Sequence, residues 1–166
     1  MPFDVTPGPN SVLIETPQGS AVKYVQVSPL APGVFTSGTV STGGYAYPQA
    51  VALRADGSYV SVSNPAQRGE TITFFATGLG QTLPFAATNV PGVPGQVVGG
   101  TLYAGVDQSS VAVISAVYQP NLIGVYAVTI QIPASTATGP AQLLRLYMVD
   151  AAGKGYPAAN SYFPIK

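Results

Sequence analysis

Residues 124–133 read Gly-Val-Tyr-Ala-Val-Thr-Ile-Gln-Ile-Pro, and this stretch decides the fold class. In it Val128, Ile130 and Ile132 alternate with polar side chains. Alternation with a period of two gives a β-strand one apolar face, whereas an amphipathic helix needs apolar residues three and four positions apart. The stretch therefore predicts a strand with one buried face.

The same alternation recurs along the chain, and no stretch has a convincing helical period. Short turn signals separate the alternating runs; Asp56-Gly57, for example, suits a tight hairpin turn because both residue types tolerate positive φ. Many short strands with frequent turns favour an all-β, Ig-like β-sandwich. The other alternating pairs are Val12 and Ile14, Val25 and Val27, Val51 and Leu53, Ile72 and Phe74, Val111 and Val113, and Leu144 and Leu146.

The composition indicates a folded protein with few charges. Of the 166 residues 46% are hydrophobic, and only 7% are charged, against roughly 25% in an average domain. Disordered chains lack that much apolar mass. The six basic residues are scattered and the net charge is zero, so no basic patch marks a nucleic-acid or anionic-membrane partner. No apolar run is long enough to span a bilayer, and a surface with so little charge favours self-association.

Two segments resemble each other and suggest an internal repeat. Residues 8–29 and residues 139–164 each open with Gly-Pro, run into an apolar strand, turn at a glycine, enter a tyrosine-containing strand and stop at proline. Each is interpreted as the last hairpin of an Ig-like unit. The expected organisation is a partial Ig-like unit over residues 1–36, a connecting β-hairpin region over 37–65 and an Ig-like β-sandwich over 66–166.

The first of these hairpins has no preceding strands with which to form a unit. An isolated two-stranded hairpin is only marginally stable in water and leaves its backbone edges unpaired. It either folds back on its own chain or completes a sheet in a neighbouring copy, and the sequence leaves both open. In the second case the hairpin is a donor segment. The residues predicted for the donated face are Val5, Val12, Ile14, Val25 and Val27.

Three ordered stretches carry a family resemblance: 29–36 (Pro-Leu-Ala-Pro-Gly-Val-Phe-Thr); Asp56-Gly-Ser58 with Asn64-Pro-Ala66 and Gly69-Glu-Thr-Ile-Thr-Phe-Phe-Ala-Thr-Gly-Leu-Gly80; and 124–133 with Gly139. Together they resemble the uncharacterised C-terminal domain of many secreted proteins of Solibacter and other Acidobacteria. Residues 69–80 are also similar to the opening strand of IPT/TIG-type Ig-like domains.

This resemblance implies tandem Ig-like sandwiches in an exported protein, at the cell surface or outside the cell, without an assigned activity. Residues 1–20 do not have the pattern of a signal peptide. Compared with the family, the chain begins inside the first Ig-like unit, which strengthens the expectation that a partner completes that unit.

The residue types leave little room for catalysis. The sequence has no His and no Cys, so imidazole triads, imidazole metal sites and thiol chemistry are excluded. The acidic residues lie far apart in sequence without the spacing of a calcium loop, and we predict no catalytic, cofactor-binding or metal-binding residue. Tyrosines such as Tyr45 and Tyr47, which share one face of a predicted strand, suit either a sandwich core, a subunit interface or sugar stacking.

These observations favour a non-enzymatic protein that binds or assembles. The first hypothesis is a structural subunit of an extracellular fibre or surface appendage, whose partner is another copy of itself, joined head to tail by strand or hairpin complementation. The alternative is a carbohydrate- or surface-binding adhesion module of a larger secreted protein, with glycans as partners.

Overall fold

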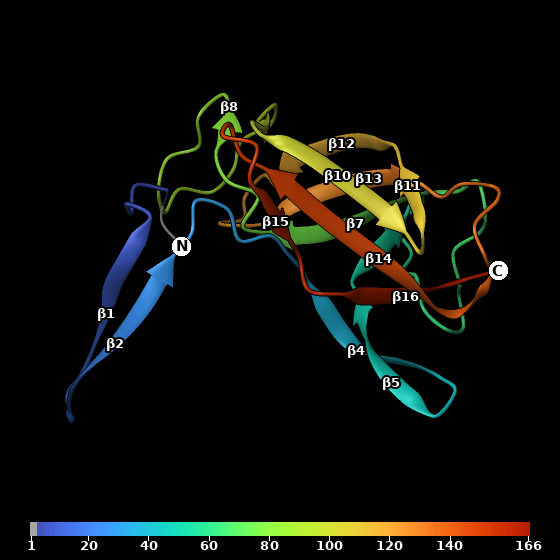
Figure 1. The fold of residues 1–166 in the computed structure, drawn as a ribbon, viewed down its shortest axis with the longest axis horizontal. Coiled ribbons are helices and arrows are strands. Elements are labelled where there is room, and N and C mark those ends of the chain that lie inside the picture. The colour runs from blue at the N-terminus through green and yellow to red at the C-terminus, as the bar shows by residue number, and fades with distance from the viewer. Residues whose placement is uncertain (1–2) are drawn as a thin grey trace.

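A computed structural model describes residues 3–166, and these residues form strands, turns and bends without a helix, as the sequence predicts. Figure 1 shows a body of packed strands from which two hairpins project. Strands β1 (Gly8–Thr16) and β2 (Gly19–Val27) form the first hairpin, at one end of the longest axis of the molecule. Because residues 3–166 contain no helix, none of them forms a helix that could cross a membrane.

The first sheet of the body has seven strands. Its central strand β14 pairs antiparallel with β10 on one side and with β16 and β15 on the other, while β16 and β5 are parallel. The spatial order is β11 (Ser109–Val111), β10 (Thr101–Val106), β14 (Gly139–Val149), β16 (Ser161–Ile165), β5 (Tyr45–Ala50) and β4 (Thr36–Thr42), with β15 (Gly155–Pro157) beside β14.

The second sheet also has seven strands and is antiparallel throughout. The sequence stretch that decides the fold provides its central strand β13, which pairs with β7 on one side and β12 on the other. The order is β3 (Gly33–Val34), β7 (Thr71–Thr77), β13 (Tyr126–Gln131), β12 (Val113–Tyr118), β9 (Val97–Val98) and β8 (Thr82–Leu83), with β6 (Ala52–Arg54) also beside β7.

One core lies between the two sheets. Ile72, Phe74, Val128 and Ile130 of the second sheet are fully buried, and so is Leu144 of the first. Each lies at a position where the period-two pattern predicts an inward side chain, because alternate residues of a strand point to opposite faces. Burying side chains of this size contributes about 1.5–3 kcal/mol each. The predicted β-sandwich core is confirmed.

A polar cluster fixes the loop between β6 and β7. Arg54 donates two hydrogen bonds to Glu70, with Nε–Oε1 at 2.6 Å and Nη2–Oε2 at 3.0 Å, and its Nη1 donates to Asn64 Oδ1 at 2.6 Å. The Asp56-Gly57 turn closes as predicted, with Gly57 at φ 82° and the Ser58 N–H donating to Asp56 Oδ1. Asp56, Asn64 and Glu70, which belong to the second stretch of the family resemblance, thus lie close together, and their hydrogen bonds stabilise this turn.

Residues 37–65 include all but the first residue of a second projecting hairpin, β4–β5, together with β6. Among residues 3–166 the outer strand β4 pairs only with β5, whereas β5 also pairs with β16, and β6 pairs with β7. The region therefore contributes strands to both sheets of the sandwich. Figure 1 shows β4–β5 leaving the body at a place well separated from β1–β2 along the longest axis.

Candidate functional site

The β1–β2 hairpin forms a sheet of its own. Its strands pair with each other over their full nine residues, from Gly8 opposite Val27 to Thr16 opposite Gly19, and with no other strand among residues 3–166. Pairing without a register shift makes the hairpin regular. Both of its outer edges therefore keep a row of free backbone N–H and C=O groups, which is the arrangement that accepts or donates a strand.

The register divides the hairpin side chains between two faces, since residues directly opposite each other point the same way. Val12 lies opposite Lys23 and Ile14 opposite Ala21, on what we term the Val12 face. Val25 shares this face, opposite Asn10. The predicted donor residues in the hairpin thus lie on one side, as the period of two requires.

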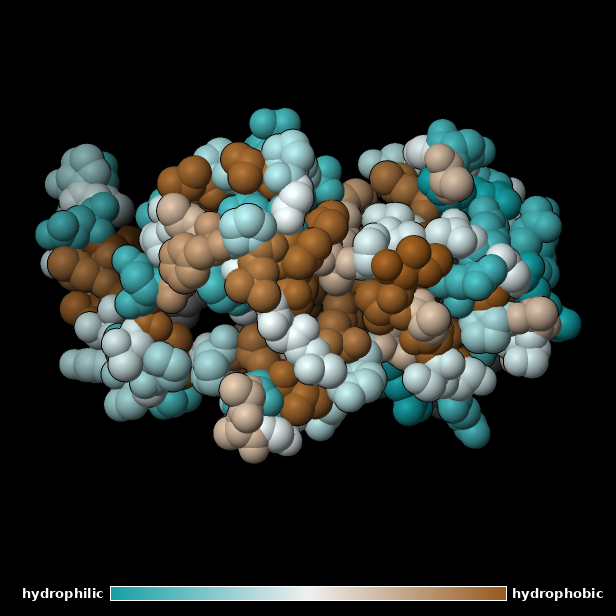
Figure 2. Space-filling view, turned by 90° about the horizontal axis from the view of Figure 1, so that it is seen from above, coloured by the Kyte–Doolittle hydropathy of each residue, from teal (hydrophilic) through white to brown (hydrophobic). Residues whose placement is uncertain are grey.

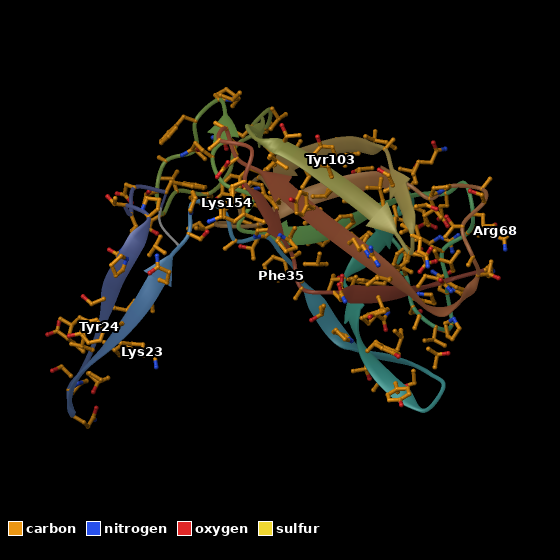
Figure 3. The ribbon with its side chains drawn as sticks, in the orientation of Figure 1. Lys23, Tyr24, Phe35, Arg68, Tyr103 and Lys154 are labelled. Carbon is orange, nitrogen blue, oxygen red and sulfur yellow. The ribbon has the colours of Figure 1, made fainter. Side chains whose placement is uncertain are left out.

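The opposite side, which we term the Leu13 face, is also apolar. Leu13 lies opposite Val22, and Tyr24, opposite Ser11, is the next residue of β2 on this face toward the hairpin base. Tyr24 is 82% exposed, and Figure 3 shows Lys23 and Tyr24 on the hairpin, away from the body. Sequence reasoning missed this second face. The run Val12-Leu13-Ile14 was the available signal, because three consecutive apolar residues in a strand place apolar side chains on both sides.

Both faces are open to solvent. Val12, Leu13, Ile14 and Val22 are 43–56% exposed. Figure 2 shows apolar side chains gathered on this projecting end of the molecule. Covering such a side chain with a partner contributes on the order of 1 kcal/mol, because about half of its apolar surface remains in water. A contiguous exposed apolar surface of this kind marks an interaction site in a soluble protein.

The hairpin is attached to the body at both of its ends. On the N-terminal side, the Phe3 ring packs edge-on against Tyr118 with centroids 6.0 Å apart, and the Phe3 N–H donates to Thr88 Oγ1 at 3.0 Å. Thr88 Oγ1 in turn donates to Asp4 Oδ1. Val5 follows, half-buried, and lines a hollow of about 480 Å³ between the hairpin base and the body.

On the C-terminal side, Val27 is only 5% exposed and lines the same hollow. The Ala31 N–H donates to the Gly78 carbonyl at 3.0 Å, and a Cβ at Gly78 would overlap the backbone of Ala31. Val27 therefore packs on its own chain, and the prediction that it lies on the donated face is corrected: the free surface extends from Val12 and Ile14 to Val25. Val5 likewise belongs to the attachment.

The β4–β5 hairpin provides a different kind of surface. Residues 36–50 contain no charged residue, and most of β4 is exposed. Tyr45 and Tyr47 lie on one face of β5, as predicted, with ring centroids 6.5 Å apart, and Tyr47 lies 4.5 Å from Tyr162 of β16. Edge strands commonly carry Lys, Pro or a bulge that prevents pairing with another chain. Strand β4 has a register shift between Thr36 and Thr39 but neither Lys nor Pro.

Two further tyrosines belong to the core. Tyr118 and Tyr126 are each 1% exposed, and their rings lie 5.0 Å apart. Tyr118 accepts a hydrogen bond from the Gly124 N–H, and Tyr126 donates one to the Gly80 carbonyl. Burial, with a smaller effect of neighbouring Tyr118, raises the pKa of Tyr126, so its hydroxyl stays a donor.

Asp150, Asp56 and Glu70 have local structural partners. The Lys154 N–H holds the pKa of Asp150 below its ordinary value, and the Tyr156 hydroxyl and the Ala152 N–H act in the same direction. A hydrogen bond from the Ser58 hydroxyl likewise lowers the pKa of Asp56. Glu70 is paired with Arg54. Among residues 3–166, no group of three acidic side chains lies close enough together to hold a metal ion.

The comparisons with known proteins add no relative. No protein-family model matches the chain, and neither a curated protein nor a solved structure matches it at a significant level.

Proposed function

We propose that this protein is a structural subunit of an extracellular fibre or surface appendage, which assembles head to tail when the β1–β2 hairpin of one copy packs on the next. The observation that carries the proposal is the hairpin itself, with two apolar faces and two unpaired edges that no strand of residues 3–166 covers. Such a hairpin is marginally stable alone and gains stability when another sheet accepts it.

The low charge supports a second copy as the occupant. A like-charged partner would be repelled, but the net charge of the chain is zero and residues 8–27 carry only Glu15 and Lys23. A homopolymer subunit needs few surface charges, because much of its surface meets another copy. Main-chain hydrogen bonds would then give affinity, and the alternating side chains would give register.

Strand β4 is the best acceptor that the sandwich offers. It is the longest strand at an end of either sheet, with seven residues, against three in β11 and two each in β3 and β8. A nine-residue donor strand needs an edge of comparable length. Added there, the hairpin would extend the first sheet and place one apolar face beside Tyr45 and Tyr47, of which Tyr45 is 70% exposed.

The positions of donor and acceptor favour a fibre. The donor lies at one end of the longest axis and β4–β5 leaves the body elsewhere, so the two surfaces are different (Figure 1). A contact between two different surfaces does not close a dimer but repeats from copy to copy. The resemblance to secreted Ig-like domains agrees with a location outside the cell or at its surface.

A substitution on the Leu13 face tests the proposal against its alternatives. Val22→Glu places a charge where a partner would bury apolar surface, and it should abolish assembly measured by light scattering. Val62→Glu is the matched control, since Val62 is similarly exposed, at 60% against 55%. Equal assembly of both variants would refute the role of the hairpin.

A second candidate function is a carbohydrate- or surface-binding adhesion module. The observation that favours it is a cross-strand pair of exposed tyrosines on the outer face of the first sheet. Tyr103 of β10 lies opposite Tyr147 of β14, with ring centroids 6.5 Å apart and exposures of 52% and 41%. Exposed aromatic pairs present the flat apolar surface on which sugar rings stack.

A further inference from the structure

Two adjoining hollows lie where β10 turns into β11. The first has a volume of about 210 Å³ and is lined by the tyrosine pair Tyr103 and Tyr147. The second has a volume of about 500 Å³ and is lined by Thr136 and Gln142. The two hollows adjoin because both are lined by Asp107, Gln108, Ser109 and Arg145.

The Asp107 carboxylate is held in a fixed position. Its Oδ1 accepts a hydrogen bond from the Leu143 N–H at 2.9 Å, and its own N–H donates to the Leu143 carbonyl at 2.8 Å. Its other oxygen, Oδ2, is buried and has no hydrogen-bond partner among residues 3–166. Asp107 also has φ at 54°, an uncommon conformation for a residue other than glycine. Asp107 itself lines both hollows, so this unpaired acceptor belongs to a residue on their boundary.

Thr136 provides a second unpaired group in the larger hollow. The residue is 3% exposed, and its Oγ1 has no hydrogen-bond partner among the described residues. A buried hydroxyl or carboxylate oxygen without a partner destabilises a protein unless a ligand or ordered water pairs with it. The two residues that carry these atoms both line the larger hollow, which favours a polar ligand there that donates and accepts hydrogen bonds.

The smaller hollow is lined by two aromatic side chains, Tyr103 and Tyr147, and by Gly105. Arg145 and Tyr147 lie on the outer face of β14, opposite Gly105 and Tyr103 of β10. Because Gly105 has no side chain, a depression remains beside the tyrosines; a Cβ there would come within 3.2 Å of the Ser109 carbonyl oxygen. Figure 3 shows Tyr103 on β10, far from the projecting hairpin.

We propose that these two hollows form a binding site for a neutral saccharide. A sugar ring presents C–H groups that stack on tyrosine and hydroxyls that donate to a carboxylate and accept from arginine or glutamine. Tyr103 and Tyr147 would stack on one ring, and Arg145 would donate from the rim. The side chains of Asp107 and Thr136 would turn toward the ligand so that Oδ2 and Oγ1 bind hydroxyls. This inference rests on the second candidate function, and the site lies apart from the hairpin that the fibre proposal uses.

The test is retention on an array of neutral oligosaccharides of glucose, galactose, mannose and N-acetylglucosamine, followed by calorimetric titration of the full chain with each retained tetrasaccharide. Tyr147→Ala removes stacking surface. Asp107→Asn keeps an oxygen for the Leu143 N–H but removes the carboxylate charge, and asparagine tolerates positive φ. Tyr59→Ala is the matched control, because Tyr59 is 65% exposed and lines neither hollow.

We expect Tyr147→Ala to weaken binding about tenfold through the loss of aromatic stacking, and Asp107→Asn to weaken it about tenfold or more through the loss of a charge-assisted hydrogen bond. Tyr59→Ala should leave binding unchanged. Absence of retention of every oligosaccharide would overturn the proposal and leave the hollows as hydration sites, and so would retention that all three variants preserve. Light scattering of the same variants reports assembly separately, so a failure of this site and a failure of the fibre proposal are distinguishable.

Discussion

Leu13 of β1 lies directly opposite Val22 of β2, and both side chains remain more than half exposed although they form the apolar side of a regular hairpin. In an isolated protein the exposure of this apolar pair to water is unfavourable. The apolar side chains of the Val12 face, on the other side of the hairpin, are exposed in the same way. We propose that a partner covers both of these exposed apolar faces. This relationship underlies the first predictions.

Charge on the Leu13 face should prevent assembly without unfolding the body. We predict that Val22→Glu keeps the melting temperature of the sandwich within about 2 °C of wild type, because Val22 contributes nothing to the core and exposed substitutions are usually worth less than about 0.5 kcal/mol. Sedimentation velocity should then show a monomer. A large fall in melting temperature would instead mean that the hairpin packs on its own body.

Charge on the edge of β4 should also prevent assembly if β4 is the acceptor. Ser41 is exposed in β4, and Ser41→Lys introduces the side chain that natural edge strands use against pairing. We expect fibres to be lost, as measured by pelleting. Ser110→Lys, on exposed Ser110 of the short edge strand β11, should leave them intact. Loss of fibres with Ser110→Lys but not with Ser41→Lys would instead identify β11 as the acceptor strand.

Cross-linking can locate the contact directly, since the chain has no cysteine. We predict that a Ser11→Cys variant mixed with a Ser41→Cys variant yields a heterodimer with a short bis-maleimide, because both serines are exposed and would lie on paired strands. Ser11→Cys mixed with Ser110→Cys should not. Cross-linking to Cys at position 110 alone would contradict the pairing on β4.

The Arg54–Glu70 pair should stabilise the turn between β6 and β7. Both side chains are mostly buried, with 16% and 18% exposure, and Glu70 also accepts from the Gln67 N–H. We predict that Glu70→Gln lowers the free energy of unfolding by about 1–3 kcal/mol, because the Arg54 guanidinium loses its charged partner. Urea unfolding measures this. Arg68→Gln, an exposed arginine without an ion pair among residues 3–166, should change it by less than about 0.5 kcal/mol.

The lowered pKa of Asp150 predicts that the stability of the folded protein decreases at acid pH. Its folded pKa is lowered, chiefly by the Lys154 N–H, so the unfolded state binds a proton more readily than the folded state. Its stabilisation is therefore fully present above the unfolded pKa and is lost as pH falls through the lower, folded pKa. Asp150→Asn should lower the melting temperature at neutral pH and differ less from wild type at pH values below both pKa values. A constant difference across this range would contradict the assignment.

The period-two pattern was sufficient to predict the sandwich but not the site. Inward positions such as Ile72, Val128 and Leu144 follow from alternation, because a strand with one buried face has no other solution. The second hairpin face was missed, since Leu13 and Val22 are exposed and no core demands them. Val27 was assigned to the donated face because it continues the alternation, although the chain beyond β2 turns back and buries it.

Side-chain contacts between residues far apart in the sequence were also not predicted. Nothing in the sequence around Glu70 indicates that Arg54 of β6 donates two hydrogen bonds to it. Asp107 was one acidic residue among six, and only the fold shows that Leu143 fixes its carboxylate beside buried Thr136. Such contacts depend on tertiary packing, which strand periodicity does not encode.

The most direct test of assembly through the β1–β2 hairpin is negative-stain electron microscopy of the purified full chain, with light scattering of the same sample. We predict filaments with a regular axial repeat, which Val22→Glu abolishes and Val62→Glu preserves. A monodisperse particle of 16.9 kDa at high concentration, with residues 8–27 protected on its own body in hydrogen exchange, would contradict the assembly of this protein through its hairpin.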